Sequence, residues 1–349
     1  LWDATEDISI ISTTSYTENF AGEDGVNPAS GFSREASYDV AGHEGTKTWI
    51  QSVNATWDIN DSWSIQSITA YQTTDYTRVE DYDVTTAPIS SLDRFGTDQS
   101  SSQEFRVKYF GARLSGVLGA YYSDTSTNYT DSFTIPLAFA YPQLPLANLV
   151  SRDSYIDYAA ENYAFFLDGE FALTEQIDFL FGGRYDNETQ TNDAISDTQI
   201  LGDIPIEYQP LLLPLTGLLR QRSETEFDAF LPKAGIRWEP SVNSTYAFVV
   251  QKAYRAGGSE ISSLDGSLNF YDPEYLWNYE LSSRQSLMNG RLTWNSNIYY
   301  ADWTDQQVAL QVPSAPNFFT TANAGESTIY GVETDLSYSV TDAIGIYGG

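Results

Sequence analysis

The chain has 349 residues, no cysteine and one histidine, and its 48 acidic residues against 17 basic ones give a formal net charge of −31. The absence of cysteine excludes disulfides and thiolate metal sites, a single histidine excludes almost all imidazole chemistry, and the negative charge argues against nucleic acid as a partner, since phosphate binding needs lysine and arginine. No run of about twenty apolar residues exists, so no membrane-spanning helix is expected.

Segments in which apolar and polar residues alternate recur along most of the chain. They include residues 104–123, 162–186, 246–254, 277–300 and 330–338. An alternation with period two is typical of β-strands that have one apolar and one polar face. About thirteen such strands are expected, which is more than an open twisted sheet usually carries, so the pattern favours closure into a barrel.

The connections between these segments alternate in length. Short turns are expected at residues 60–62, 110–112, 174–176, 240–243, 288–290 and 341–343, and long polar loops at residues 21–46, 83–100, 124–158, 187–226, 256–274 and 304–325. Because a long loop follows each short turn, all short turns lie at one end of the sheet and all long loops at the other. Outer-membrane barrels have this asymmetry, with short periplasmic turns and long external loops.

One face of each strand is expected to contact lipid, and the other to line a lumen. The even-numbered residues of 246–254 and of 292–300 are predicted to point outward, and Trp57, Trp63 and Trp238 lie beside short turns, where an interfacial aromatic girdle belongs. Sandwich strands have about five or six residues, whereas these have about ten or more, as a tilted strand needs to cross a bilayer. An antiparallel transmembrane β-barrel is therefore favoured over the alternative, a soluble sandwich or propeller.

Several stretches resemble successive barrel strands of TonB-dependent outer-membrane receptors. They are SSQEFRVKY at 101–109, LPKAGIRW at 231–238, AYRAGGSE at 253–260, PEYLWNYELSSRQSLMNGRLTWNSNIYYADWTDQQV at 273–308 and NAGESTIYGVETDLSY at 323–338. The resemblance implies an all-β barrel of roughly twenty-two strands, plugged by an N-terminal domain, that takes up a scarce solute with energy from the TonB complex.

The same resemblance implies that residues 1–349 are the middle of such a barrel domain, incomplete at both ends and without the plug. The expected location is the outer membrane of a Gram-negative cell. The expected partners are outer-membrane lipid and lipopolysaccharide, the TonB complex through the missing N-terminal part, and a small solute such as a metal chelate, a vitamin or an oligosaccharide. The alternative is a passive or structural outer-membrane barrel without a plug.

Two pairs of carboxylates share a strand face, Asp168 with Glu170 and Glu333 with Asp335. Such pairs serve as acid and base in glycosidases, but charges are ordinary on a lumen face, so no enzyme activity is expected. Acidic runs such as GEDG and YDNETQTND lack the spacing of a calcium loop, so no metal site and no cofactor is expected. An acidic excess on one rim and in the lumen would favour cationic or metal-bearing solutes.

Candidate ligand contacts lie in the loops that follow Tyr254 and Trp303, both expected outside. The aromatic candidates are Phe270 and Tyr271 in the first loop and Phe318 and Phe319 in the second. These rings would either contact a solute or pack the two loops against each other.

Two further features of the long loops have two interpretations each. Arg255, at a strand end, would pair with an anionic group of a solute or with a neighbouring carboxylate. The apolar segment IPIEYQPLLLPLTGLL at 204–219 would form a short helix that packs its loop onto the barrel rim, or a hydrophobic wall over a ligand.

Overall fold

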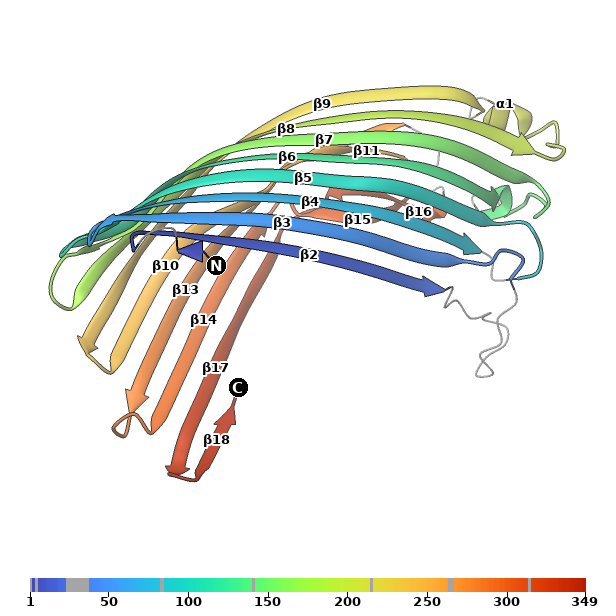
Figure 1. Cartoon of the computed structure of the whole chain (residues 1–349). Coiled ribbons are helices and arrows are strands. Elements are labelled where there is room, and N and C mark those ends of the chain that lie inside the picture. Colours follow the sequence, from blue (N-terminus) through green and yellow to red (C-terminus); the bar gives the residue numbers. More distant parts are fainter. Residues whose placement is uncertain are drawn as a thin grey trace.

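The computed structural model describes residues 2–3, 6–22, 38–81, 85–139, 142–213, 216–262, 267–312 and 315–349. These residues form one fourteen-stranded sheet, in which neighbouring strands pair antiparallel. The strand order follows the chain, except that one hairpin leaves the sheet between β10 and β13 and another between β14 and β17. The sheet curves as part of a barrel wall (Figure 1).

The strands of the sheet are β1 (Trp2–Asp3), β2 (Ile8–Gly22), β3 (His43–Asn60), β4 (Trp63–Asp81), β5 (Ser91–Phe110), β6 (Leu114–Pro136), β7 (Leu149–Ala172), β8 (Ile177–Leu201), β9 (Gly217–Ser241), β10 (Ser244–Arg255), β13 (Glu274–Leu287), β14 (Leu292–Thr304), β17 (Ser327–Thr341) and β18 (Ile344–Gly348). The inserted hairpins are β11 (Gly258–Ile261) with β12 (Leu268–Tyr271), and β15 (Gln307–Val312) with β16 (Ala315–Asn323). The described residues also include two short helical segments, η2 (Leu137–Phe139) and α1 (Gln209–Leu212). Within the described residues no helix is long and apolar enough to cross a membrane.

The predicted short turns are confirmed. Each of the six predicted connections has two to four residues, and Figure 1 shows them together at one end of the sheet. In the turn between β13 and β14, Met288, Asn289 and Gly290 have φ angles of 56°, 57° and 80°. Glycine and asparagine tolerate this left-handed region, which lets a tight turn join two long strands.

The predicted extent of three long loops is wrong. Strands continue through most of residues 83–100, 124–158 and 187–226, and β8 and β9 have 25 residues each, about 80 Å at the usual rise per residue. We call the added parts the collar; they are residues 91–101, 124–136, 149–161, 189–201 and 217–226. The collar has no continuous apolar stripe, because a strand outside the membrane needs none, and cross-strand hydrogen bonds and polar pairs stabilise it instead. Apolar alternation therefore could not reveal it.

The predicted lipid-facing side is confirmed. In the strand register Leu281 lies opposite Ile298, which lies opposite Val332, and all three side chains are exposed. The even-numbered Tyr246 and Phe248 are exposed in the same way, so no second sheet covers this face. The sandwich alternative is therefore excluded for the described residues.

Aromatic pairs border this apolar band at two levels. Ring centroids lie 4.7 Å apart in the pair Trp63–Tyr109 beside the short turns, and 4.9 Å apart in the pair Tyr122–Tyr163 farther along the strands. On β4 the segment from Trp63 to Tyr71 has nine residues. This is close to the length that a tilted strand needs to cross a bilayer, so the two levels correspond to the interfacial girdles.

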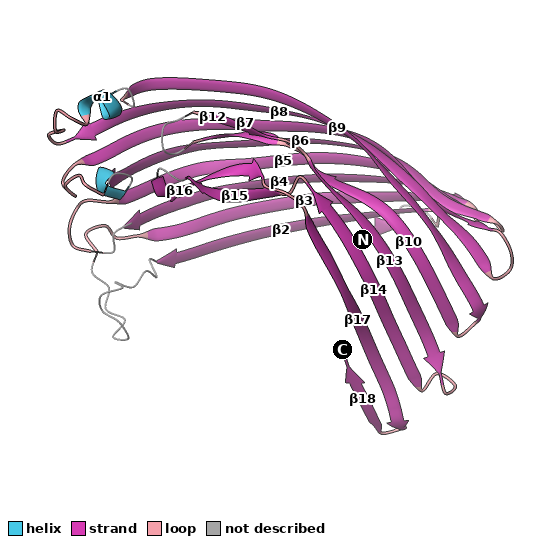
Figure 2. Ribbon diagram, turned by 180° about the vertical axis from the view of Figure 1, so that it is seen from behind, coloured by secondary structure: helices cyan, strands magenta, loops and turns pink. Residues whose placement is uncertain are grey.

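Both inserted hairpins fold onto the concave side of the sheet, where Figures 1 and 2 show β15 and β16 beneath the arch of β3 to β9. Gln190 Nε2 donates to the Gly257 carbonyl at 3.1 Å, and Asn192 Nδ2 donates to the Ser259 carbonyl at 3.4 Å. The loops after Tyr254 and Trp303 were expected to lie outside. They start at the predicted end of the sheet but turn back into the lumen.

Candidate ligand-binding site on the lumen side

Two glycines allow the β11–β12 hairpin to lie against the barrel wall. A Cβ atom at Gly257 would lie 2.4 Å from the Tyr271 carbonyl oxygen and 2.7 Å from Cε1 of Phe227 on β9. A Cβ at Gly258 would lie 2.5 Å from the Tyr271 hydroxyl. Because these distances are shorter than any van der Waals contact, only glycine permits this approach of backbone to wall.

A carboxylate joins the two hairpins to each other. Glu260 on β11 accepts hydrogen bonds from Thr320 Oγ1 at 2.7 Å, Thr321 N at 2.6 Å and Thr321 Oγ1 at 2.7 Å, all on β16. Asn269 on β12 adds a bond from Nδ2 to the Thr321 carbonyl at 2.6 Å. Burial alone would raise the pKa of Glu260, but the bonds from Thr321, Thr320 and Asn269 outweigh it and hold the pKa below its ordinary value. We call this cluster the Glu260 latch.

Arg255 pairs with a neighbouring carboxylate, which is one of its two predicted roles. Its Nε lies 2.9 Å from Glu274 Oε1, and the Glu274 side chain is only 5% exposed. Arg255 also donates to the Gln307 carbonyl at 3.3 Å, and Gln307 N donates to Glu274 Oε2 at 2.5 Å. This network ties the start of one hairpin to the start of the other.

The predicted aromatic residues have different environments. Tyr271 is half-buried against the hairpin; burial and the nearby Glu260 carboxylate raise its pKa, although Arg255 opposes the shift, so its phenol stays neutral. Phe270 and Phe319 are 58% and 59% exposed. Phe318 belongs to β16, but only its backbone is part of the described structure.

The apolar segment 204–219 packs one loop against another. It contains α1, and Leu212 is fully buried in a cluster with Leu137 and Leu144 of the β6–β7 connection. Val150 and Ile200, at the outer ends of β7 and β8, pack against the same cluster. The interpretation as a short helix on the rim is therefore confirmed for the described part of the segment.

The carboxylate pair on β7 is engaged by cations from β9. Lys233 Nζ lies 2.7 Å from Asp168 Oδ2, and Arg237 Nη1 lies 2.8 Å from Glu170 Oε2. Arg237 also contacts Asp178 at 2.8 Å. These ion pairs link three neighbouring strands on the lumen face, which is a structural role.

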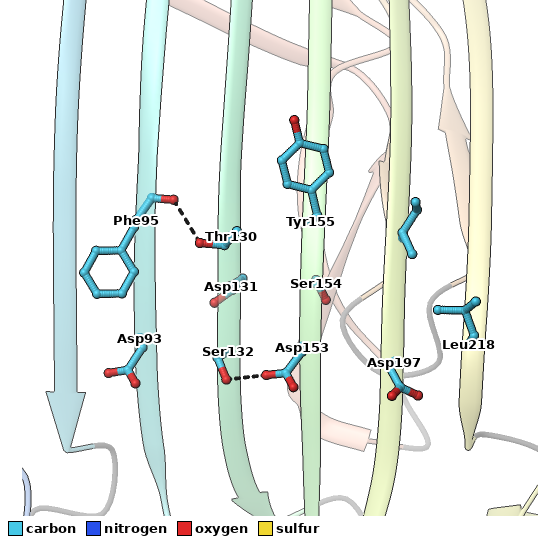
Figure 3. A pocket seen from close by; sticks show the side chains of 11 residues that line it. Asp93, Phe95, Thr130, Asp131, Ser132, Asp153, Ser154, Tyr155, Asp197 and Leu218 are labelled. Atoms are coloured by element: carbon cyan, nitrogen blue, oxygen red, sulfur yellow. Dashed lines mark hydrogen bonds between the residues drawn. The ribbon is translucent and has the colours of Figure 1, made fainter.

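A shallow depression of about 430 Å³ lies on the opposite, outward face of the collar. Figure 3 shows Asp93, Asp153 and Asp197 on three different strands, together with Phe95 and Tyr155. Ser132 Oγ donates to Asp153 Oδ1 at 2.5 Å. The described residues include no group of three or more histidine, cysteine or acidic side chains arranged to hold a metal ion. Sequence reasoning missed this depression because its strands were taken for loops.

The sheet, its short turns at one end, its apolar outward band between aromatic girdles and its polar lumen face define an outer-membrane β-barrel of a Gram-negative cell. The chain belongs to the TonB dependent receptor-like β-barrel family, which matches residues 3–349.

Solved structures of this fold include two receptors and a transporter to which the chain is similar. The ferric yersiniabactin uptake receptor FyuA from Yersinia pestis is 18% identical, with a TM-score of 0.74 over 96% of this chain and 47% of that one. The siderophore receptor PiuA from Acinetobacter baumannii is 15% identical, with a TM-score of 0.60 over 95% and 52%. The ferric citrate transporter FecA is 13% identical, with a TM-score of 0.62 over 97% and 46%. The chain therefore spans about half the length of these proteins.

Proposed function

We propose that the complete protein is an outer-membrane receptor that binds a scarce solute outside the cell and takes it up with energy supplied through TonB. The observation that carries the proposal is the position of the two hairpins, which occupy the lumen and are fixed there by the Glu260 latch and the pair Arg255–Glu274. A passive channel keeps its lumen open to water, whereas a receptor needs groups in the lumen that bind its solute. The passive or structural barrel is therefore the less favoured function.

A metal chelate is the proposed solute, in preference to a vitamin or an oligosaccharide. Three similar structures are a siderophore receptor, a ferric yersiniabactin uptake receptor and a ferric citrate transporter. Phe270 and Phe319 supply exposed rings on the hairpins, which suits contact with the organic part of a chelate. Tyr271 and Arg255 would hold these hairpins in place, and Phe318 stays a candidate contact.

We also propose the partners that such a receptor needs. The TonB complex would contact a segment N-terminal to this chain. Outer-membrane lipid would contact the exposed apolar band. The exposed basic residues Lys47, Arg220 and Arg222, on the outward face beyond the outer girdle, would face lipopolysaccharide. Arg220 Nη2 and Arg222 Nη1 lie 2.8 and 3.8 Å from Asp193 Oδ2. The two arginines and this one aspartate together carry one net positive charge.

Uptake of a radiolabelled iron chelate by cells that carry the full-length receptor tests the function. A panel of ferric hydroxamate, catecholate and citrate complexes is given to a host without its own receptors, in a strain with TonB and in one without it. The proposal expects saturable uptake of one complex that is lost without TonB. Uptake that is linear in concentration and equal in both strains would instead establish a passive barrel.

A further inference from the structure

The outward depression on the collar contains a row of apolar side chains that nothing in the described structure covers. In the strand register Phe95 lies opposite Thr130, Thr130 opposite Tyr155, and Tyr155 opposite Ile195, with Leu218 of β9 diagonally beside Ile195. Figure 3 shows Phe95, Tyr155 and Leu218 on three different strands of this face. Phe95 and Tyr155 are half-exposed, and Leu218 is 77% exposed. We call Phe95, Tyr155, Ile195 and Leu218 the apolar row.

Membrane lipid does not reach the apolar row. On β7, Tyr155 lies eight residues beyond Tyr163 of the outer girdle, which is about 26 Å along the strand and about 20 Å in height at the usual strand tilt of about 40°. The polar headgroup layer is only about 5 to 8 Å thick. The outward residues between the two tyrosines are Asp157, Ala159 and Glu161, so the apolar row is separate from the lipid-facing band. A separate exposed apolar patch with a polar surround indicates an interaction site.

A row of carboxylates runs parallel to the apolar row. Asp93 lies opposite Ser132, Ser132 opposite Asp153, and Asp153 opposite Asp197, and this row is two residues, about 7 Å, farther from the membrane. Within the described residues none of these three aspartates forms a salt bridge. Asp153 accepts a hydrogen bond from Ser132 Oγ at 2.5 Å, and Asp197 accepts one from Gln199 Nε2 at 3.4 Å. We call Asp93, Asp153 and Asp197 the aspartate row.

The charge at this place is negative even when the neighbouring cations are counted. Arg220 and Arg222, which follow the apolar row on β9, carry one net positive charge together with Asp193. Asp131 also borders the depression, but its carboxylate pairs with Arg94. The three carboxylates of the aspartate row therefore leave a net charge of −2 at the depression.

This charge decides which kind of partner fits the apolar row. Lipopolysaccharide phosphates are negative and would be repelled, and the same face of a second copy of this chain carries the same net charge. A metal ion alone is disfavoured, because the described residues hold no group of acidic side chains arranged to bind one. A protein segment with apolar side chains along one edge and lysines or arginines along the other would cover both rows at once.

We propose that the two rows bind a cationic, amphipathic segment of a protein outside the cell. Its apolar side chains pack on the apolar row, and its lysines or arginines pair with the aspartate row. The inference goes beyond the proposed function, because these rows face away from the lumen that the solute would enter.

A short fluorescent peptide of alternating lysine and leucine is the probe. Its affinity for the full-length receptor in a neutral detergent is measured by fluorescence anisotropy at physiological ionic strength. The triple variant Asp93→Asn, Asp153→Asn and Asp197→Asn should weaken binding about thirtyfold to a hundredfold, because each exposed ion pair contributes about threefold to fivefold. Tyr155→Ser should weaken binding about tenfold, whereas Tyr155→Phe, which keeps the ring, should leave it unchanged. The peptide binds the detergent equally in every sample, so this background does not affect the comparison.

The matched control removes three other carboxylates from the same outward face, in the triple variant Asp124→Asn, Glu161→Gln and Glu226→Gln. These residues also share one row of the strand register, through Thr189 of β8. On β7 this row lies eight residues nearer the membrane than Asp153, about 26 Å away, which is beyond the range of screened charges. Peptide binding should therefore stay unchanged. Heat-modifiable gel mobility shows whether each variant forms a folded barrel.

Equal losses of affinity in the two triple variants would overturn the inference, because binding would then follow net charge alone. An unchanged affinity in Tyr155→Ser, or no measurable affinity in the wild type, would overturn it as well. Displacement of the peptide by lipopolysaccharide in magnesium but not in EDTA would assign this face to cation-bridged lipopolysaccharide instead. A wild-type dimer that Tyr155→Ser dissociates would assign it to a second copy of the receptor.

Discussion

The Glu260 latch predicts that the two lumen hairpins open together when one carboxylate is removed. In Glu260→Ala the three short bonds from Thr320 and Thr321 are lost. Hydrogen bonds to a charged group contribute about 1.5 kcal/mol or more each when buried, and we take about 1 kcal/mol each because Glu260 is half-buried and water can replace part of the interaction. The total is about 3 kcal/mol, equivalent to about a hundredfold change in the opening equilibrium.

Hydrogen–deuterium exchange of the full-length receptor measures this opening. Amides of β15 and β16 should exchange about a hundredfold faster in Glu260→Ala, while β13 and β14 keep their protection because their ladder is intact. Glu326→Ala is the control, since this exposed glutamate lies just after the same hairpin. If β15 and β16 keep wild-type protection in Glu260→Ala, the latch does not hold the hairpins, and the bond count above is the wrong basis for their stability.

Four other outcomes are expected. Gly257→Val should detach the β11–β12 hairpin from the wall and raise its protease sensitivity without preventing barrel assembly, whereas Gly345→Ala, where a Cβ meets nothing closer than 3.9 Å, should be neutral in the same assay. Because folding lowers the pKa of Glu260, the stabilisation from the latch should be fully present above pH 4.5 and be lost only as the pH falls through the lowered pKa. Amide protection of the hairpins that declines already between pH 7 and 5 would contradict the lowered pKa. Arg255→Gln should speed amide exchange in both hairpins about tenfold, because a buried carboxylate on β13 loses its cation, and unchanged exchange would mean that the ion pair is dispensable. Phe319→Ala should weaken binding of the proposed metal chelate about tenfold with normal assembly, and unchanged affinity would leave this ring with a packing role only.

The membrane-crossing part of the fold could be predicted from the sequence because lipid imposes a pattern on it. Side chains such as Leu281 and Ile298 must be apolar on one face, and residues on the other face are under no such constraint. The turn at residues 288–290 was also predictable, since asparagine and glycine together indicate a tight hairpin. Both signals are local, so one sequence suffices to detect them.

The collar and the Glu260 latch could not be predicted for the opposite reason. The run Asn187 to Asp193 is polar at every position, and the same composition is typical of loops. The latch depends on Glu260 and Thr321, which are 61 residues apart in sequence and meet only because both hairpins fold into the lumen. The Gly257–Gly258 pair was the available signal for the inward hairpin, because two adjacent glycines after a strand indicate close backbone approach.

The collar has a consequence for how such a receptor changes during evolution. Backbone hydrogen bonds join each pair of neighbouring strands from β5 to β9. They fix where each collar side chain lies, whatever that side chain is. Outward residues such as Tyr155 and Asp157 face any antibody or phage that reaches the cell, and they can be replaced without moving Gln190 or Asn192 on the lumen face. We expect a surface under immune or viral pressure to vary quickly here, while the inner wall of the barrel stays the same.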